Sequence, residues 1–129
     1  MTAVDTVAMI AVLQYFWFGG LVGKARRIHG IKAPAVVGNE QFERVYRVQM
    51  NTLELLVAFL PTLYVAARYW PPGAVAGVGA VYLVGRILYW RAYVTEPSRR
   101  SLGFLLSIGP VFTLALAALV AAVLGRAAT

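Results

Sequence analysis

The chain has 129 residues, of which 60% are hydrophobic and only 13% are charged, and its formal net charge is +7. Soluble domains are usually about half apolar and about a quarter charged, so this composition excludes an ordinary soluble domain and predicts a single membrane domain. The chain has no cysteine and one histidine, His29. Disulfides, thiolate metal sites and a cysteine nucleophile are therefore excluded, and we expect no metal cofactor.

Four apolar stretches each approach the roughly 20 residues that cross a bilayer as a helix. Because hydrocarbon cannot satisfy backbone polar groups, each stretch is expected to be helical. The predicted spans cover residues of about 6–23, 45–67, 74–93 and 102–124. Two prolines between the second and third spans predict a tight break and an antiparallel hairpin. The predicted fold class is therefore an all-α, integral membrane four-helix bundle within residues 1–129.

The start of the chain shows no sign of a cleavable signal peptide. It lacks a basic segment before the apolar run and carries Asp5 instead. We therefore expect the first span to be a retained membrane helix.

Basic residues gather in the loops after the first and third spans, whereas the loop after the second span holds only Arg68. The positive-inside rule then places the two basic loops in the cytoplasm and both termini on the other side. Arg126 near the carboxyl end opposes this assignment. Because the charge lies between apolar segments, membrane topology explains it better than nucleic-acid binding does.

The second span begins with polar residues that are unusual in a membrane helix. Arg47, Asn51 and Glu54 are spaced four and three residues apart, which places them on one helical face. An ionised side chain at the centre of a membrane helix costs about 2.5–3.5 kcal/mol, so Glu54 requires a partner. Arg86 lies at a matching depth in the third span, within a stripe that also holds three tyrosines. We therefore predict a buried ion pair between Glu54 and Arg86.

Both polar stripes run toward the expected cytoplasmic end, where the loop arginines also gather. Such a site is electropositive and contains a carboxylate, an amide and several phenols, which suits a small anionic ligand that carries carboxylates and an amine. Two structural interpretations stand beside this one. Polar residues also hold membrane helices together, and arginines and tyrosines near helix ends also act as topology signals and interfacial anchors.

Two long segments closely resemble the helix-two and helix-three signatures of the MAPEG family (membrane-associated proteins in eicosanoid and glutathione metabolism). They are Phe42–Glu54, with the sequence FERVYRVQMNTLE, and Val81–Tyr93, with the sequence VYLVGRILYWRAY. The resemblance covers nearly the whole chain and is greatest to members of the leukotriene C4 synthase and microsomal glutathione transferase type. It implies a homotrimer with a glutathione site at each subunit interface, open to the cytoplasm and flanked by membrane lipid.

The resemblance also implies roles for individual residues. Arg100 falls where the family places the arginine that activates the glutathione thiol, although the adjacent Arg99 competes for that role and Pro97 could shift the register. The residues at glutathione-contact positions are Arg26, Arg47, Gln49, Asn51, Glu54, Tyr89 and Tyr93. Leu55 departs from leukotriene C4 synthase, which has a tyrosine there. The loop after the third span also differs from that of the synthase, which puts a leukotriene substrate in doubt.

The activity that the resemblance implies is that of a glutathione transferase or peroxidase. An arginine beside the thiol would stabilise the thiolate, which attacks a hydrophobic electrophile or a lipid hydroperoxide. One alternative is a non-catalytic scaffold or lipid-binding protein like the five-lipoxygenase-activating protein. Another is a small four-helix multidrug exporter. Such exporters rely on a carboxylate in the middle of helix one, whereas the first span here has no charge after Asp5.

Overall fold

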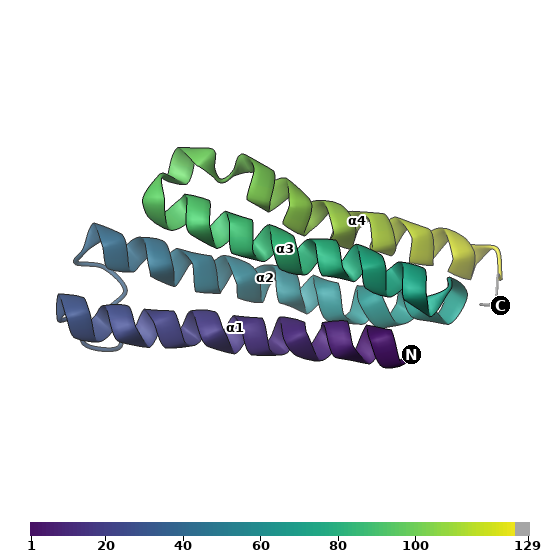
Figure 1. Ribbon diagram of the computed structural model, residues 1–129, viewed down its shortest axis with the longest axis horizontal. Helices are drawn as coiled ribbons and strands as arrows, with labels where there is room; N and C mark the ends of the chain where they lie inside the picture. Colours follow the sequence, from purple (N-terminus) through teal and green to yellow (C-terminus); the bar gives the residue numbers. More distant parts are fainter. Residues whose placement is uncertain (126–129) are drawn as a thin grey trace.

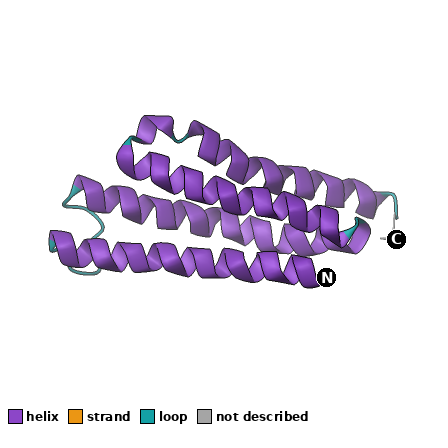
Figure 2. Cartoon of the chain, viewed as in Figure 1, coloured by secondary structure: helices purple, strands orange, loops and turns teal. Residues whose placement is uncertain are grey.

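The computed structural model describes residues 1–125, which form four long antiparallel helices (Figure 1). The helices are α1 (Thr2–His29), α2 (Glu40–Tyr69), α3 (Pro72–Thr95) and α4 (Ser101–Val123), and a 3₁₀ turn, η1 (Pro97–Arg99), precedes α4. The described part of the chain contains no strand (Figure 2). Because all four helices are long and apolar enough to cross a membrane, the predicted all-α membrane fold is confirmed. Arg126, whose charge opposed the predicted topology, lies outside the described residues.

Each helix contains its predicted span, with one exception: Leu124, the last residue of the fourth predicted span, lies one residue past the end of α4. Local sequence features determine where the helices begin and end. Gly30 closes α1 in the left-handed conformation, with φ at 68°. Asn39 caps α2 because its side chain accepts a hydrogen bond of 3.0 Å from the backbone N–H of Phe42. Pro72 is the first residue of α3, where its missing N–H is not needed.

The two middle helices hold the bundle together. Both α2 and α3 contact the other three helices, whereas α1 and α4 lie on opposite sides (Figure 1). In the half of the bundle near the amino terminus, the rings of Phe59 and Tyr82 stack with centroids 3.9 Å apart. Leu63 is also fully buried there. This apolar half contrasts with the polar contacts at the other end of the same helices.

Glycine lets α3 and α4 approach at backbone distance. A Cβ atom added to Gly103 of α4 would collide with the backbone of Tyr89, and one added to Gly85 of α3 would collide with the backbone at Leu106 and Ser107. Small residues commonly permit such approach between membrane helices. The close contact positions Tyr89 relative to the first turn of α4.

The connections after α1 and α3 lie at the same end of the bundle, opposite both the amino terminus and the α2–α3 connection (Figure 1). The basic residues of these two connections therefore share one end of the molecule. We call this end the loop end. Its location on the cytoplasmic side remains a prediction.

Candidate functional site

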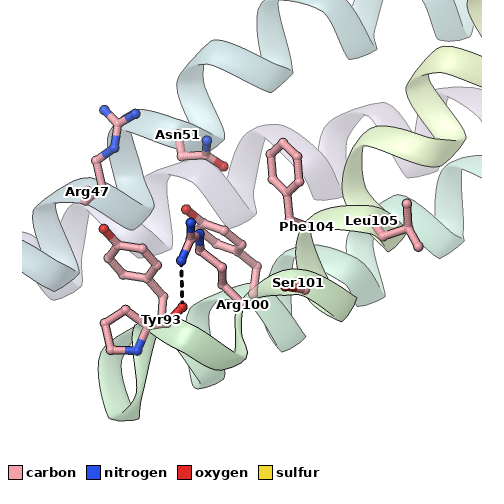
Figure 3. Close-up of a pocket in the computed structure, with 9 residues that line it drawn as sticks. Arg47, Asn51, Tyr93, Arg100, Ser101, Phe104 and Leu105 are labelled. Carbon is pink, nitrogen blue, oxygen red and sulfur yellow. Dashed lines mark hydrogen bonds between the residues drawn. The ribbon is translucent and has the colours of Figure 1, made fainter.

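A cavity of about 700 Å³ opens at the loop end (Figure 3). It is lined by side chains of α2, α3, α4 and the turn that precedes α4. We call it the loop-end cavity. Its lining residues are Arg47, Asn51, Tyr89, Tyr93, Pro97, Arg100, Ser101, Phe104 and Leu105. Figure 3 shows the α2 side chains on one side of the cavity and those of the turn and α4 on the other. Five predicted site residues, from α2, α3 and the turn before α4, therefore share one cavity.

The turn before α4 distinguishes the two neighbouring arginines. Arg100 lines the cavity and donates a hydrogen bond of 3.0 Å from Nη1 to the carbonyl oxygen of Pro97, the dashed line in Figure 3. Arg99 instead forms an exposed ion pair with Glu96, with 2.9 Å between Nε and Oε2, and does not line the cavity. The geometry therefore favours Arg100 as the arginine that meets a ligand.

The two tyrosines of α3 form one wall of the loop-end cavity. The rings of Tyr89 and Tyr93, one helical turn apart, are stacked with centroids 5.4 Å apart. The Tyr89 side chain is almost fully buried, and its ring also packs near Phe104 of α4, at 6.2 Å between centroids. These contacts make the wall partly aromatic, with the two phenols as its polar groups.

The predicted ion pair between Glu54 and Arg86 is wrong. Glu54 instead lies 3.6 Å from Arg47, measured between Oε1 and Nη2, and the two side chains are 61% and 53% exposed. The reason is rotation about the helix axis rather than depth. At about 100° per residue, Glu54 lies roughly 200° around α2 from the buried Thr52, so it faces away from α3.

Arg86 is 0% exposed, and its guanidinium contacts neutral partners on two other helices. Nη1 donates to Oδ1 of Asn51 at 2.8 Å and to Oγ1 of Thr52 at 3.1 Å, and Nε donates to Oγ of Ser107 at 2.9 Å. Its Cζ atom also lies 4.4 Å from the ring centroid of Tyr89. Arg86 therefore lies beneath the loop-end cavity and contacts two of its lining residues, Asn51 and Tyr89.

The charges around the loop-end cavity favour an anionic ligand. Arg47 and Arg100 line the cavity, Arg86 lies behind it, and no Asp or Glu is among the lining residues. Such a concentration of positive charge attracts anions and holds their carboxylates. Within residues 1–125, no group of three His, Cys, Asp or Glu side chains lies close enough to hold a metal ion.

Besides Glu54, two of the predicted contact residues do not line the loop-end cavity. Arg26 donates a hydrogen bond of 2.7 Å to the carbonyl oxygen of Ala35 and lies over the ring of Phe42, with Cζ 4.9 Å from its centroid. Gln49 packs against α1, where a Cβ added to Gly19 would lie 2.8 Å from its amide nitrogen. Both residues therefore lie on the α1 side of α2.

The apolar wall of the cavity was not predicted from the sequence. Phe104 and Leu105 follow Arg100 by four and five residues, so the first turns of α4 present them toward the same cavity. That spacing could have identified them once Arg100 was a candidate. Thr52 and Ser107, the hydroxyl partners of Arg86, carried no such signal because isolated hydroxyls are common in membrane helices.

The chain is similar to known proteins along most of its length. The profile of the MAPEG family matches residues 4–120. An uncharacterized protein of Synechocystis is 46% identical over 100 residues, covering 78% of this chain and 73% of that protein. Human microsomal glutathione S-transferase 2 is 38% identical over 103 residues, or 80% and 70% of the two chains. Leukotriene C4 synthase of Cavia porcellus is 41% identical over 95 residues, or 74% and 63%.

Proposed function

The chain belongs to the MAPEG family, and on that premise we propose that it is a membrane-bound glutathione transferase or peroxidase that acts on hydrophobic substrates. Relatives named glutathione S-transferase and leukotriene C4 synthase support a glutathione-related function in a membrane. The observation that carries the proposal is the loop-end cavity. It combines two arginines, an amide and two phenols, with no lining carboxylate.

Glutathione fits this cavity by its chemistry, since it offers two carboxylates, two amides, an amine and a thiol. Arg47 supplies a guanidinium for one carboxylate, and Asn51 supplies an amide for hydrogen bonding. Glu54, exposed beside Arg47, supplies a carboxylate that is suited to the ligand's amine. The phenol of Tyr93 provides a further donor on the opposite wall.

In this proposal Arg100 stabilises the thiolate. A free thiol has a pKa of about 8.5, so only a small part of it is ionised at neutral pH. A guanidinium that donates to the sulfur favours the anion, and each pKa unit corresponds to about 1.4 kcal/mol. Arginine stays protonated, so it acts by electrostatics and does not accept the thiol proton.

The apolar wall of the cavity lets a hydrophobic substrate approach from the bilayer. Leu105 lines the cavity and is 63% exposed, and its neighbour Leu102 is also exposed. The thiolate would form a C–S bond at an electrophilic carbon, either by displacing a leaving group or by adding to an activated double bond that then takes up a proton. With a lipid hydroperoxide, the sulfur would bond to the terminal oxygen as the O–O bond breaks and the lipid leaves as the alcohol. A second glutathione would then convert the sulfenic acid to the disulfide and water. Phe104 and Leu105 on one side and the arginines on the other match a reaction between a polar thiol and an apolar partner.

A neighbouring copy of the chain would complete the site. Arg26 and Gln49 occupy glutathione-contact positions of the family but lie on the α1 side of α2, away from the loop-end cavity. A homotrimer in which the α1–α2 face of one copy meets the cavity of the next would bring the two groups together. By the positive-inside rule, these sites would face the cytoplasm, with both termini on the other side.

The decisive experiment titrates detergent-purified protein with glutathione and follows thiolate absorbance by ultraviolet difference spectroscopy. The wild type is expected to give a saturable thiolate signal that Arg100→Ala abolishes and Arg99→Ala retains. Because the two arginines are adjacent and both exposed, Arg99→Ala is the matched control. Binding without thiolate would contradict activation, and no binding at all would favour a scaffold like the five-lipoxygenase-activating protein.

A further inference from the structure

We infer that Arg86 is a positioning residue: it turns the side-chain amide of Asn51 so that the NH₂ group, and not the oxygen, is available to the ligand in the loop-end cavity. This inference rests on the proposed function and adds a residue that does not itself line the cavity. It follows from the hydrogen bonds, the burial and the charge of Arg86.

The hydrogen bond between Arg86 and Asn51 determines which end of the amide faces α3. A guanidinium has five N–H donors and no acceptor, so the 2.8 Å contact from Nη1 must be made with the amide oxygen. The terminal torsion of an asparagine side chain is broad and roughly two-fold, so without this contact either end could face the cavity. With it, Oδ1 is turned toward Arg86 and Nδ2 is left to donate toward the cavity.

The guanidinium is itself held in one orientation by two hydroxyls. Thr52 donates its hydroxyl proton to the carbonyl of Val48 at 2.8 Å, and Ser107 donates its own to the carbonyl of Gly103 at 2.7 Å. Their lone pairs therefore accept from Arg86, at 3.1 and 2.9 Å. Since Thr52 is on α2 and Ser107 on α4, Arg86 is fixed by both helices that flank the cavity.

A purely structural role does not account for this charge. Among residues 1–125, no carboxylate forms an ion pair with Arg86, and its Nη2 atom is buried without a hydrogen-bond partner. Besides its three hydrogen bonds to neutral groups, the cation contacts the face of Tyr89, with Cζ 4.4 Å from the ring centroid. Burying a charge that has no ion-pair partner costs free energy, so stability alone does not explain an arginine at this position. An unneutralised arginine beneath an anion site is better explained by what it does for that site.

The orientation of Asn51 has a consequence for the ligand. Asn51 lies one helical turn from Arg47, so two donors of α2 face the loop-end cavity side by side. The ligand group at this position must then be an acceptor, such as a carboxylate or a peptide carbonyl of glutathione. A ligand that places an amine or another donor there would leave both sides unpaired and be rejected.

The test uses the full-length protein in detergent and measures glutathione affinity by calorimetry and the midpoint of thermal unfolding. Asn51→Asp replaces the NH₂ donor with an oxygen and gives Arg86 the counter-ion that it lacks. We expect the unfolding midpoint to rise while glutathione binding weakens by about tenfold or more. A role limited to holding helices together would raise the midpoint and leave the affinity unchanged, which would overturn the inference.

A second arm asks whether Arg86 acts through Asn51. Arg86→Met and Asn51→Ala are each expected to weaken glutathione binding by about tenfold, and the double variant is expected to bind no more weakly than Asn51→Ala. Full addition of the two losses would overturn the inference. If Arg86→Met does not fold, the opposite shifts of affinity and midpoint in Asn51→Asp decide the matter alone.

Tyr82→Phe serves as the matched control, because Tyr82 is also fully buried, lies one turn from Arg86 on α3 and does not line the cavity. Its glutathione affinity should equal that of the wild type. Wild-type binding is measured first in the same series. Its absence would refute the proposed function, whereas wild-type binding with unaltered variants would refute only the role of Arg86.

Discussion

The two halves of the α2–α3 contact use the same pair of helices for different purposes. Tyr82 and Arg86 are one turn apart and are both fully buried. Toward the amino-terminal end, Tyr82 stacks on Phe59 in an apolar contact. Toward the loop end, Arg86 contacts Asn51 and Thr52 by hydrogen bonds. The apolar half stabilises the bundle by packing. The polar half instead holds the buried charge of Arg86, which burial disfavours, next to residues that line the cavity.

We predict that changes in the apolar half affect stability without affecting the site. Phe59→Ala removes a fully buried ring that stacks on Tyr82, so the free energy of unfolding should fall by roughly 3–5 kcal/mol. Thermal unfolding in detergent measures the loss. The glutathione affinity of the fraction that remains folded should be unchanged, and a parallel loss of affinity would show that the two halves are coupled.

Changes at the cavity should do the reverse. Arg100→Ala is expected to lower turnover by roughly 100- to 1000-fold, which corresponds to about 2.7–4 kcal/mol. This is the usual effect of removing one hydrogen-bond donor that stabilises an anion during catalysis. The midpoint of thermal unfolding should barely move, because the Arg100 side chain is exposed. Assays with a hydrophobic electrophile and with a lipid hydroperoxide measure this effect. Equal losses in Arg99→Ala would contradict the assignment.

Gly103 lies where the two functions meet, because it allows α4 to touch α3 at Tyr89. Gly103→Ala would force the helices apart, and we expect a loss of roughly 1–3 kcal/mol in stability together with weaker glutathione binding. Gly109→Ala is the control on the same helix, since a Cβ atom there meets nothing within 4 Å. Similar behaviour of the two variants would show that close approach at Gly103 is not required.

The smallest expected effect concerns Tyr82. Its buried hydroxyl has no hydrogen-bond partner within residues 1–125, so Tyr82→Phe removes an unsatisfied polar group and keeps the stacked ring. We expect the free energy of unfolding to rise by about 1 kcal/mol. A fall in the unfolding midpoint would show instead that the hydroxyl has a partner in the membrane-embedded protein.

The polar residues illustrate which features of the site could be predicted from the sequence and which could not. The spacing of Arg47 and Asn51 correctly placed them on one face of α2, and the tyrosines Tyr89 and Tyr93 form another wall of the same cavity. The matching depths of Glu54 and Arg86 were a poor guide to their contact, because depth depends only on position along the helix. Which residue of α2 faces Arg86 depends on the rotation of the helix, and this rotation turns Asn51 and Thr52 toward it.

The sequence by itself determined the four membrane helices, because each must bury about 20 apolar residues and satisfy its own backbone in hydrocarbon. It also determined the family, through two long signatures within the matched residues 4–120. Only the tertiary structure decided that Arg100 and not Arg99 lines the cavity, and that Arg86 lies beneath it. Those outcomes depend on helix rotation and on the backbone approach at Gly103, which arise from contacts between helices and not from any one segment.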